Sequence, residues 1–343
     1  MQRQTIVVTG GAGYIGSHTA LLLAQHGYHV IIIDNLSQHH ALNTQQSFSP
    51  TWAQVIVADF ADETILKNIF STHTISAVMH FAARIEVSHS VTDPLGFYQN
   101  NVVKTISLLE QMVKHGIQKF IFSSSCAVYG EPQMLPITEE HPKNPISPYG
   151  KNKLIIEMAL HDFQKAYGLE YVSLRYFNAA GALPEYGLGE QHVPESHIIP
   201  LLLRAAHAQK PFSIFGTTHP TKDGTCIRDY LHVLDIASAH ERALQHLLDN
   251  KPSDSFNIGT GTGYSVKQMI DAAQKITGMP IKTINAEKRA GDPPQLIADP
   301  TRAHNILQWQ PRFSDLDFIM RSAYAFEHRT SINNASHEEK SYF

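Results

Sequence analysis

Tyr149 and Lys153 are the two residues whose types and spacing most directly indicate chemistry. Of the 13 tyrosines in the chain, only this one is followed by lysine four positions later. Residues i and i+4 of a helix share one face, so the phenol and the ammonium would point the same way. A free tyrosine has a pKa of about 10, and a neighbouring positive charge favours the phenolate. The pair therefore predicts a base that takes a proton from an alcohol.

Three consecutive serines, Ser123–Ser125, follow a run of buried character, Phe120–Ser123. In a doubly wound sheet, ligands bind at the carboxyl ends of the strands, where these serines would lie. We expect Ser125 to share the reacting proton with Tyr149. The alternative is a plain role for the serines in capping the strand end.

A glycine-rich turn near the N-terminus predicts a phosphate-binding site. It follows a predicted strand and opens a predicted helix, which is the context that gives this motif its meaning. Glycines permit the tight turn and let the backbone approach a pyrophosphate, and the helix N-terminus offers free N–H groups. The turn reads Gly10-Gly11-Ala12-Gly13-Tyr14-Ile15-Gly16.

Two acidic residues after the next strands specify the dinucleotide further. Asp34 stands about 18 residues after Gly16, where a carboxylate binds the adenosine ribose hydroxyls and repels a 2′-phosphate, so NAD is favoured over NADP. Asp59 follows the third predicted strand and is placed to meet the adenine amino group. A helix N-cap role for Asp59, before Ala61–Ile65, is equally compatible with the sequence.

The elements that must position these residues alternate between β-branched runs and amphipathic segments, which predicts a doubly wound, Rossmann-type α/β sheet. Glu131–Pro148 contains five prolines and is expected to be a long loop. The predicted strands are Thr5–Thr9, Val30–Ile33, Val55–Ala58, Ala77–Phe81, Phe120–Ser123 and Tyr171–Phe177; the predicted helices are Tyr14–His26, Asp62–Thr72, Asn100–His115 and Tyr149–Gly168.

The pattern changes after Phe177, so we expect three regions. Residues 1–177 form the dinucleotide domain, residues 178–330 a smaller mixed α/β substrate domain with some elements free to pack back on the first, and residues 331–343 a flexible tail. The first part of the second region, Asn178–Pro194, is expected to be a loop. Its predicted elements are a helix at Ile198–Ala208, a strand at Phe212–Phe215, a helix at Leu234–Leu248, a strand at Phe256–Ile258 and a helix at Val266–Thr277.

Composition excludes several other classes of protein. A net charge of -4 gives no general attraction to nucleic acid or to an anionic membrane, and no stretch is apolar for long enough to span a bilayer. Two cysteines, without a C-x-x-C motif, fit a reducing cytoplasm. Most of the 21 histidines are scattered singly, and the only adjacent pair, His39–His40, has no third ligand at metal-site spacing, so no metal is expected.

Taken together, these motifs resemble the extended short-chain dehydrogenase/reductase family, and within it the UDP-glucose 4-epimerases, also called UDP-galactose 4-epimerases. The similarity runs in order over nearly the whole chain. It is carried by VTGGAGYIGSH (Val8–His18), IDNLS (Ile33–Ser37), VMHFAA (Val78–Ala83), YQNNV (Tyr98–Val102), FIFSSSCAVYGEP (Phe120–Pro132), NPISPYGKNK (Asn144–Lys153), LRYFNAAGA (Leu174–Ala182), DGTCIRDYLHV (Asp223–Val233) and FNIGTG (Phe256–Gly261).

The resemblance implies an isomerase of carbohydrate metabolism that interconverts UDP-glucose and UDP-galactose with a tightly held NAD. Tyr149 would take the proton of the sugar 4-hydroxyl while hydride passes to NAD; the 4-keto sugar then turns over and hydride returns to its other face. Lys153 and the positive nicotinamide would both favour the phenolate, and Lys153 would hold the nicotinamide ribose. A homodimer is implied, through the helices after Asn100 and Tyr149.

Residue by residue, the resemblance also implies the two binding sites. Phe215 would stack on uracil, Arg228 and Arg289 would bind the diphosphate, and Asp292 would accept from the uridine ribose. Asn178 would reach the phosphates or the sugar, and His197 and Ile198 would present backbone to the nucleotide. Besides the residues of the turn, Asp34 and Asp59, the cofactor contacts would be Asn35, Phe60, Phe81, Ala82, Asn100, Ser123, Tyr149, Lys153 and Phe177, and the sugar would also meet Ser125, Tyr149 and Leu296.

Three departures from the family pattern bear on alternatives. Ser88-His89 stands in a run near the nicotinamide where the family usually reads Val-Gly-Glu-Ser. Leu296 replaces a tyrosine that walls the hexose pocket in some members, which keeps open an epimerase for N-acetylhexosamines or pentoses. Cys126-Ala127 follows Ser125 where 4,6-dehydratases carry an Asp-Glu pair, which argues against dehydration. A catalytically silent NAD-binding regulator is opposed by intact Tyr149, Lys153 and Ser125.

Overall fold

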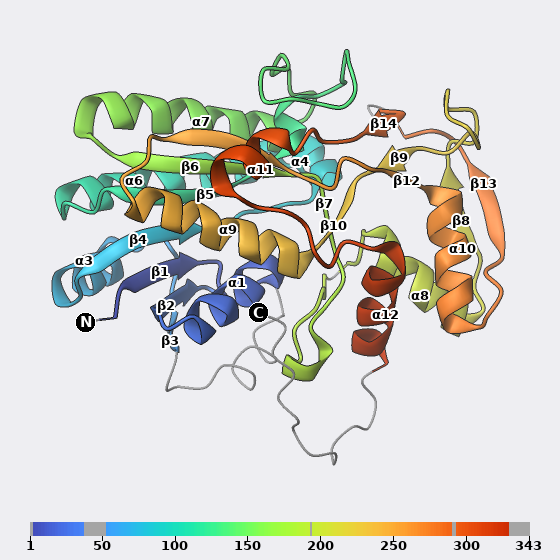
Figure 1. Cartoon of the computed structure of the whole chain (residues 1–343), viewed down its shortest axis with the longest axis horizontal. Coiled ribbons are helices and arrows are strands. Elements are labelled where there is room, and N and C mark those ends of the chain that lie inside the picture. Colours follow the sequence, from blue (N-terminus) through green and yellow to red (C-terminus); the bar gives the residue numbers. More distant parts are fainter. Residues whose placement is uncertain (1–2, 38–52, 193, 290–292, 329–343) are drawn as a thin grey trace.

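A seven-stranded parallel sheet forms the centre of the molecule (Figure 1). The computed structural model describes residues 3–37, 53–192, 194–289 and 293–328. The strand order is β11-β6-β5-β4-β1-β2-β3, which contains the 3-2-1-4-5-6 order of dinucleotide-binding folds and confirms the predicted fold class. The strands are β1 (Thr5–Thr9), β2 (His29–Asp34), β3 (Ala53–Val57), β4 (Ile75–His80), β5 (Lys119–Ser125), β6 (Glu170–Tyr176) and β11 (Asp254–Ile258).

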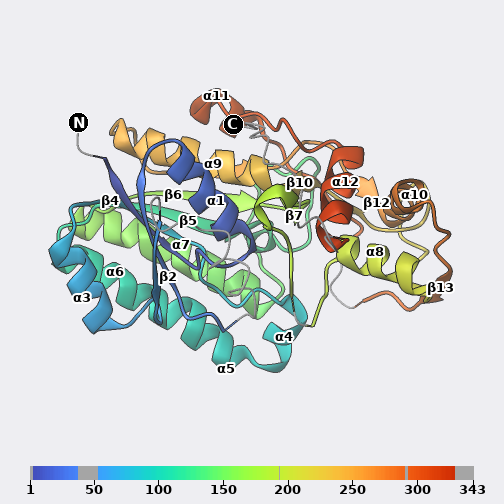
Figure 2. The same ribbon diagram turned by 90° about the horizontal axis from the view of Figure 1, so that it is seen from below.

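Helices cover both faces of this sheet (Figure 2), as a parallel sheet of β-branched residues requires. One face packs against α1 (Tyr14–Gln25) and α9 (Val233–Leu248), which also contact each other. The other face is covered by α3 (Glu63–Thr72), α6 (Lys104–Lys114) and α7 (Pro148–Tyr167). Two hydrophobic cores result, one on each side of the sheet. They hold its strands rigidly, so that their carboxyl ends can serve as a fixed platform.

The helix expected from Asn100 to His115 was placed with the wrong start. In the structure the chain turns helical at α5 (Pro94–Phe97), passes through a π-helical segment, η1 (Tyr98–Val103), and continues as α6. Proline fits the first turn of a helix because its missing N–H is not needed there, and the Asp93 side chain accepts from the Gly96 amide as an N-cap. Asp93-Pro94 therefore starts the helix instead of marking the loop before it.

The second half of the chain contributes to two places. Beyond residue 178, β11 pairs with β6 and α9 lies on the sheet, so both join the dinucleotide fold. The helices α8 (Ile198–Ala208), α10 (Val266–Thr277) and α12 (Leu316–Glu327) pack together around a third core. Beside them, β8 (Phe212–Phe215) pairs with β13 (Thr283–Ala286).

Short elements that the sequence pattern did not predict complete the structure. Part of the loop expected at Asn178–Pro194 is in fact a strand and a 3-10 turn. No helix within the described ranges has the length and apolar character needed to cross a membrane, and residues 331–343 and His39–His40 lie outside those ranges. The short elements are α4 (Val87–Thr92), η2 (Cys126–Val128), β7 (Asn178–Ala180), η3 (Pro184–Tyr186), β9 (Ile227–Arg228), β10 (Tyr230–His232), β12 (Tyr264–Ser265), β14 (Gln295–Leu296) and α11 (Thr301–Leu307).

Candidate functional site

A cavity of about 1730 Å³ opens at the carboxyl ends of the central strands, between the sheet and the second half of the chain. This volume exceeds the roughly 300–1,000 Å³ of a pocket for one drug-sized ligand, so two ligands fit side by side. The cavity brings together most of the residues singled out from the sequence. Those lining it are Gly10, Gly13, Tyr14, Ile15, Gly16, Asp34, Asn35, Phe60, Phe81, Ala82, Asn100, Ser123, Ser125, Tyr149, Phe177, Asn178, His197, Ile198, Phe215, Arg228, Arg289 and Leu296.

The glycine turn presents bare backbone to this cavity. A Cβ on Gly10, whose φ is +70°, would meet the Ala82 nitrogen at 2.5 Å, and one on Gly16 would meet the Gly10 oxygen at 2.2 Å. Gly13 is the N-cap of α1 and supplies no capping side chain. The N-terminal amides of α1 therefore face the cavity, with the partial positive charge that binds a pyrophosphate. This cradle fits a dinucleotide.

The acidic residues beside the turn are held by the backbone. Asp34 accepts from the Ala12 amide at 3.0 Å and from the Leu36 amide at 2.9 Å, and burial raises the pKa of its carboxyl despite these bonds. Each carboxylate oxygen keeps a second lone pair for a ribose hydroxyl. Asp59 forms an ion pair with Lys104 and lies just behind the cavity wall. The alternative N-cap role of Asp59 was wrong, because Asp62 caps α3 by accepting from two amides.

The remaining expected cofactor residues lie along the ends of β4 and β5. The amides of Phe81 and Ala82 both donate to the Thr9 carbonyl, and the Phe81 ring lies 4.5 Å from that of His240. The Asn100 amide donates to Asn101 Oδ1 at 3.0 Å. Phe60 and Phe177 are buried in the wall. These contacts fix the wall without ligands, so the cavity does not depend on them for its shape.

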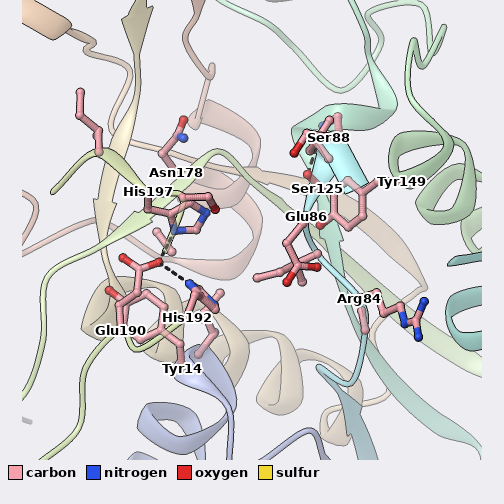
Figure 3. A pocket seen from close by; sticks show the side chains of 18 of the residues that line it. Tyr14, Arg84, Glu86, Ser88, Ser125, Tyr149, Asn178, Glu190, His192 and His197 are labelled. Atoms are coloured by element: carbon pink, nitrogen blue, oxygen red, sulfur yellow. Dashed lines mark hydrogen bonds and ion pairs between the residues drawn. The ribbon is translucent and has the colours of Figure 1, made fainter. Parts of the chain in front are cut away.

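Tyr149 reaches the cavity because of how α7 starts. Ser147 is the N-cap of this helix and accepts from the Gly150 amide at 3.1 Å, and Pro148 occupies its first turn. The phenol therefore points toward the end of β5, where it forms a hydrogen bond with the Ser125 side chain (Figure 3). The predicted sharing of a proton between these two residues is geometrically available in the structure.

Lys153 lies one turn further along α7 and does not reach the cavity surface. Its side chain is only 3% exposed, donates to the Ser123 carbonyl at 2.7 Å, and places Nζ 5.7 Å from the centre of the Tyr149 ring. Burial lowers the pKa of Lys153 to about 7, although Glu157, one turn on, opposes this.

The expected low pKa of Tyr149 is not a property of the chain alone. Burial raises the pKa of the phenol, and the neighbouring Tyr176 adds to this, while the hydrogen bond with Ser125 works in the opposite direction. The correction has a simple cause, because a phenolate loses its hydration in a wall that contributes little charge. Further positive charge must arrive at the site before the phenolate is accessible near neutral pH.

The residues expected to bind the nucleotide lie across the cavity from Tyr149. The Arg289 guanidinium stacks on Phe215, 4.0 Å from the ring centre, and the Phe215 side chain is 37% exposed. Arg228 is buried and donates to the backbone carbonyls of Ile227 and Pro293. Leu296 is paired with Arg228 in the β9–β14 ladder and packs beside Cys126 and Phe177.

The other expected substrate residues have mixed outcomes. Asn178 begins β7 and points into the cavity (Figure 3). His197 is the N-cap of α8, but its amide is already donated to Glu195 Oε1 at 2.9 Å, which leaves Ile198 as the freer of the two backbone positions. Asp292 lies outside the described residues.

Several cavity residues were missed from the sequence. Lys104 stands four positions after Asn100, so helical spacing was the signal for it. Glu86 and Ser88 belong to the run noted for departing from the family pattern. Glu190 and His192 belong to a short stretch rich in Glu and His, which the view of the histidines as singly scattered overlooked. All five line the cavity.

Comparison with known proteins agrees with this geometry. The model of the NAD dependent epimerase/dehydratase family matches residues 6–259. UDP-glucose 4-epimerase of Halalkalibacterium halodurans is 46% identical over 336 residues, which are 98% of each chain. The crystal structure of UDP-glucose 4-epimerase from Brucella ovis in complex with NAD superposes with a TM-score of 0.88 at 43% identity, covering 94% of this chain and 97% of that one.

UDP-glucose 4-epimerase from Bifidobacterium longum, solved in complex with NAD+ and UDP, is also similar, with a TM-score of 0.88 at 36% identity over 95% of this chain and 99% of that one. These similarities extend over both halves, as the cavity does. The nucleotide cradle fits NAD, and the match to the family model spans the turn, the serines and the Tyr-Lys pair. The chain belongs to the NAD dependent epimerase/dehydratase family.

Proposed function

We propose that this chain interconverts UDP-glucose and UDP-galactose by transient oxidation at C4 of the hexose, through a 4-keto sugar. The observation that carries the proposal is the hydrogen-bonded pair of Tyr149 and Ser125 in the same cavity as the glycine cradle. Near-full-length relatives named UDP-glucose 4-epimerase, and neighbours solved with NAD and with UDP, support it. The bare cradle and the acidic Asp34 support NAD as the bound dinucleotide.

Tyr149 is the general base and acid of the reaction. Its phenolate takes the proton of the sugar 4-hydroxyl as the C4–H bond breaks, and its phenol gives the proton back when C4 is reduced. Ser125 hydrogen-bonds to Tyr149 and to the same sugar oxygen, and so keeps the two in line for transfer. When bound, oxidised NAD accepts the C4 hydride, returns it to the opposite face of the sugar, and adds a positive charge near the phenol.

Lys153 supplies the positive charge that belongs to the chain itself. Across about 6 Å, an ammonium favours a phenolate by about 3 kcal/mol at an effective dielectric constant of about 20, which corresponds to about two pKa units. Its bond to the Ser123 carbonyl holds the ammonium in place. Lys153 also holds the nicotinamide ribose in this proposal.

The second half of the chain grips the nucleotide and leaves the hexose free to turn over. Phe215 stacks on uracil, Arg228 and Arg289 bind the diphosphate, and Asn178 with the backbone at His197 and Ile198 meets the phosphates or sugar. Asp292 accepts from the uridine ribose. Firm binding at this end retains the keto sugar, while a hexose held by few polar contacts can present either face to the bound dinucleotide.

A substrate panel tests the proposal. Purified protein, without added cofactor, is expected to carry NAD and to convert UDP-galactose to UDP-glucose, measured by chromatography of the sugar nucleotides. Turnover that depends on an added oxidant, or NAD-loaded protein without turnover, would contradict it, and the second result would favour a regulator.

A second substrate class is favoured by one observation. Leu296 lies at the cavity wall, where a tyrosine would occupy more of the hexose end. The free space fits an N-acetyl group, so we include UDP-N-acetylglucosamine and UDP-pentoses in the same panel. Turnover of UDP-N-acetylglucosamine at a comparable rate would broaden the function to several UDP-sugars.

We also propose that the chain forms a homodimer in the cytoplasm. Exposed apolar side chains gather on α4, α5, η1 and α7, which pack together on one side of the sheet. An apolar patch shared by packed helices is typical of a two-fold interface. Both cysteines are free, which fits a reducing compartment. The patch consists of Val87, Val91, Leu95, Val103, Ile155 and Met158.

Light scattering coupled to size-exclusion chromatography tests the interface. Met158→Glu places a charge in the patch and is expected to shift the dimer toward monomer. Ile306→Glu, at an equally apolar exposed site on α11, is the matched control and should leave the dimer intact. A wild-type monomer, or equal behaviour of the two variants, would contradict the proposed interface.

A further inference from the structure

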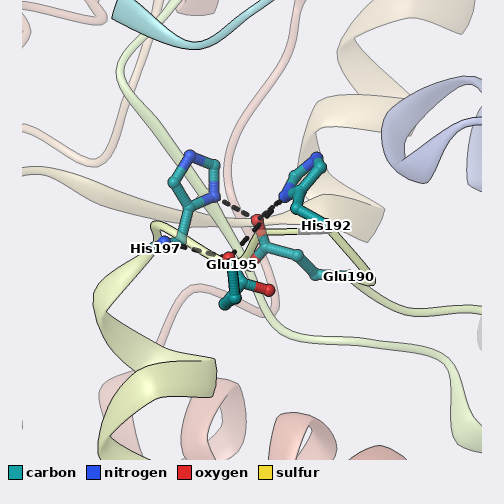
Figure 4. A group of neighbouring side chains, drawn as sticks. All are labelled: Glu190, His192, Glu195 and His197. Atoms are coloured by element: carbon teal, nitrogen blue, oxygen red, sulfur yellow. Dashed lines mark hydrogen bonds and ion pairs between the residues drawn. The ribbon is translucent and has the colours of Figure 1, made fainter. Parts of the chain in front are cut away.

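The stretch between β7 and α8 gathers two glutamates and two histidines around one point (Figure 4). Glu190, His192, Glu195 and His197 each turn one ligand atom inward, and these atoms all lie within 4.8 Å of one another. The four residues fall within eight positions, in the spacing Glu-x-His-x-x-Glu-x-His. The reaction proposed above uses none of these four side chains.

Three of the four side chains are almost completely buried. Those of Glu190, His192 and Glu195 are 7%, 8% and 3% exposed, whereas that of His197 is 46% exposed. His192 Nδ1 lies 3.1 Å from Glu190 Oε1 and 3.8 Å from Glu195 Oε1, and His197 Nδ1 contacts the same Glu190 oxygen. Two carboxylates placed this close inside a protein require positive charge between them.

One atom of the cluster indicates that the chain alone does not complete it. Glu195 Oε2 is buried and has no hydrogen-bond partner among the described residues. The Arg204 guanidinium approaches it at 3.8 Å, which is beyond hydrogen-bond distance. The other oxygen, Oε1, accepts from the amides of Ser196 at 2.8 Å and His197 at 2.9 Å, so the carboxylate is held in this orientation. A buried carboxylate oxygen left without a partner is rare and points to a ligand.

We propose that Glu190, His192, Glu195 and His197 bind one divalent transition-metal ion of the Zn²⁺ class. Imidazole nitrogens and carboxylate oxygens are ligands that Zn²⁺ and its neighbours accept in proteins. Metal–ligand distances of about 2.0–2.2 Å in a tetrahedron separate the ligand atoms by about 3.4 Å, a modest contraction of the present cluster. Two carboxylates balance the charge of the ion, and four protein ligands close its coordination, which is typical of a structural site.

Protons are the competing occupants of this cluster. Although burial lowers the pKa of His192, its hydrogen bonds to Glu190 and Glu195 outweigh this and raise the pKa to about 9. Without an ion, the cluster therefore holds protons at neutral pH, and a metal ion must displace them. Metal analysis separates the two occupants, because only one of them leaves a metal in the purified protein.

The position of the cluster gives the ion a role in shaping the cavity. Glu190, His192 and His197 line the cavity, and Figure 3 shows them beside Tyr14 of the glycine turn. Tyr14 donates to the Gly181 carbonyl at 2.6 Å, so the loop and the turn touch the same wall. An ion that joins residues 190 and 197 holds the N-terminus of α8 in place. This consequence for UDP rests on the proposed function; the metal site itself does not.

Metal analysis of tag-free protein, purified without chelators, tests the site. Mass spectrometry of the elements is expected to find about one transition-metal ion per chain, most of it lost in the double variant His192→Gln/Glu195→Gln. His161→Gln, which changes an exposed histidine on α7, is the matched control and should keep the ion. Wild-type protein that neither contains an ion nor takes one up from ZnCl2 would overturn the proposal in favour of the proton-filled cluster.

A second measurement on wild-type protein keeps the test decisive if the double variant does not fold. After removal of metal with a chelator, Co²⁺ is expected to give the intense visible absorption of a tetrahedral site. Zn²⁺ at a hundredfold excess over its Kd should raise the thermal midpoint by about 3 °C. A weak octahedral Co²⁺ spectrum with no thermal shift would overturn the site. Loss of UDP affinity on metal removal, followed by calorimetry, tests the link to the cavity separately.

Discussion

The two walls of the cavity differ in how firmly the chain holds its own side chains. On the Rossmann side, Ser123 and Lys153 are 2% and 3% exposed, and each bonds to other parts of the chain. On the opposite side, Phe215 is 37% exposed and meets only a stacked arginine among the contacts described above. The first wall is built on strands and helix starts, whereas the second is built on short strands and loops.

This difference matches a division of labour. Proton and hydride transfer require reacting atoms fixed within about 0.5 Å, which buried and mutually bonded residues provide. Nucleotide binding gains from side chains that close on the ligand, since desolvating a stacked ring and a guanidinium strengthens both contacts. Changes on the first wall should therefore lower kcat, and changes on the second should raise KM.

The largest effect is expected from Tyr149→Phe. Removing the phenolic oxygen deletes the base while the ring still fills its place, so kcat should fall by about 10²–10⁴-fold. Bound NAD, measured by release and absorbance, should remain near the wild-type amount. Tyr167→Phe, at the exposed end of the same helix, is the control. Retained activity in Tyr149→Phe would remove the residue from its role.

Lys153→Met should lower kcat by about 10²-fold, because the phenolate loses its neighbouring cation. It should also change how stability depends on pH. The pKa of Lys153 is about 7 in the folded chain and about 10.4 in an unfolded one, so between these values the unfolded state binds more protons and the wild-type free energy of unfolding rises with pH.

That rise should be absent in Lys153→Met and present in Lys151→Met, which changes an exposed lysine on the same helix. Urea unfolding of nucleotide-free protein at pH 7 and pH 9 measures it. At pH 7 and below, the buried ammonium opposes folding in full, so the methionine variant should be the more stable protein there. Equal pH dependence in all three proteins would show that the burial of Lys153 does not govern this term.

On the second wall, Arg289→Ala should raise KM for the UDP-sugar by about tenfold, with kcat nearly unchanged. Phe215→Ala should act in the same way. Arg312→Ala is the matched control, because Arg312 lies over Phe313 in a similar stacked pair that does not line the cavity. A fall in kcat without a change in KM would contradict the proposed division between the walls.

The smallest expected effect is that of Leu296→Tyr. The larger ring would fill space at the hexose end, so kcat/KM for UDP-N-acetylglucosamine should fall by about tenfold relative to UDP-galactose. Steady-state kinetics with both substrates measures the ratio. An unchanged ratio would show that Leu296 does not set the size of the pocket.

The sequence predicted the first wall better than the second for a physical reason. Gly10–Gly16 and Tyr149-x-x-x-Lys153 carry their meaning in local spacing, because one turn or one helix positions all their members. The predicted helix Ile198–Ala208 and strand Phe212–Phe215 were also confirmed residue for residue, since their apolar patterns are clear. Pairings such as β9 with β14 join segments about 70 residues apart, and no local pattern announces them.

Environment was harder to predict than position. The sequence placed a lysine near Tyr149 and so indicated a lowered phenol pKa, but the low exposure of both groups works the other way. The start of the helix at Pro94 was missed because proline was interpreted as a loop signal. The Glu-His stretch at residues 190–197 was missed because its members meet only when the loop folds back on itself.

The central claim is that C4 is oxidised and then reduced by the same hydride. Conversion of UDP-galactose carrying deuterium at C4 tests this most directly, in ordinary water and without added cofactor, with mass spectrometry or NMR of the UDP-glucose formed. The account predicts that the deuterium stays at C4 of the product. Loss of the deuterium to solvent would contradict it, because the hydrogen would then have left as a proton.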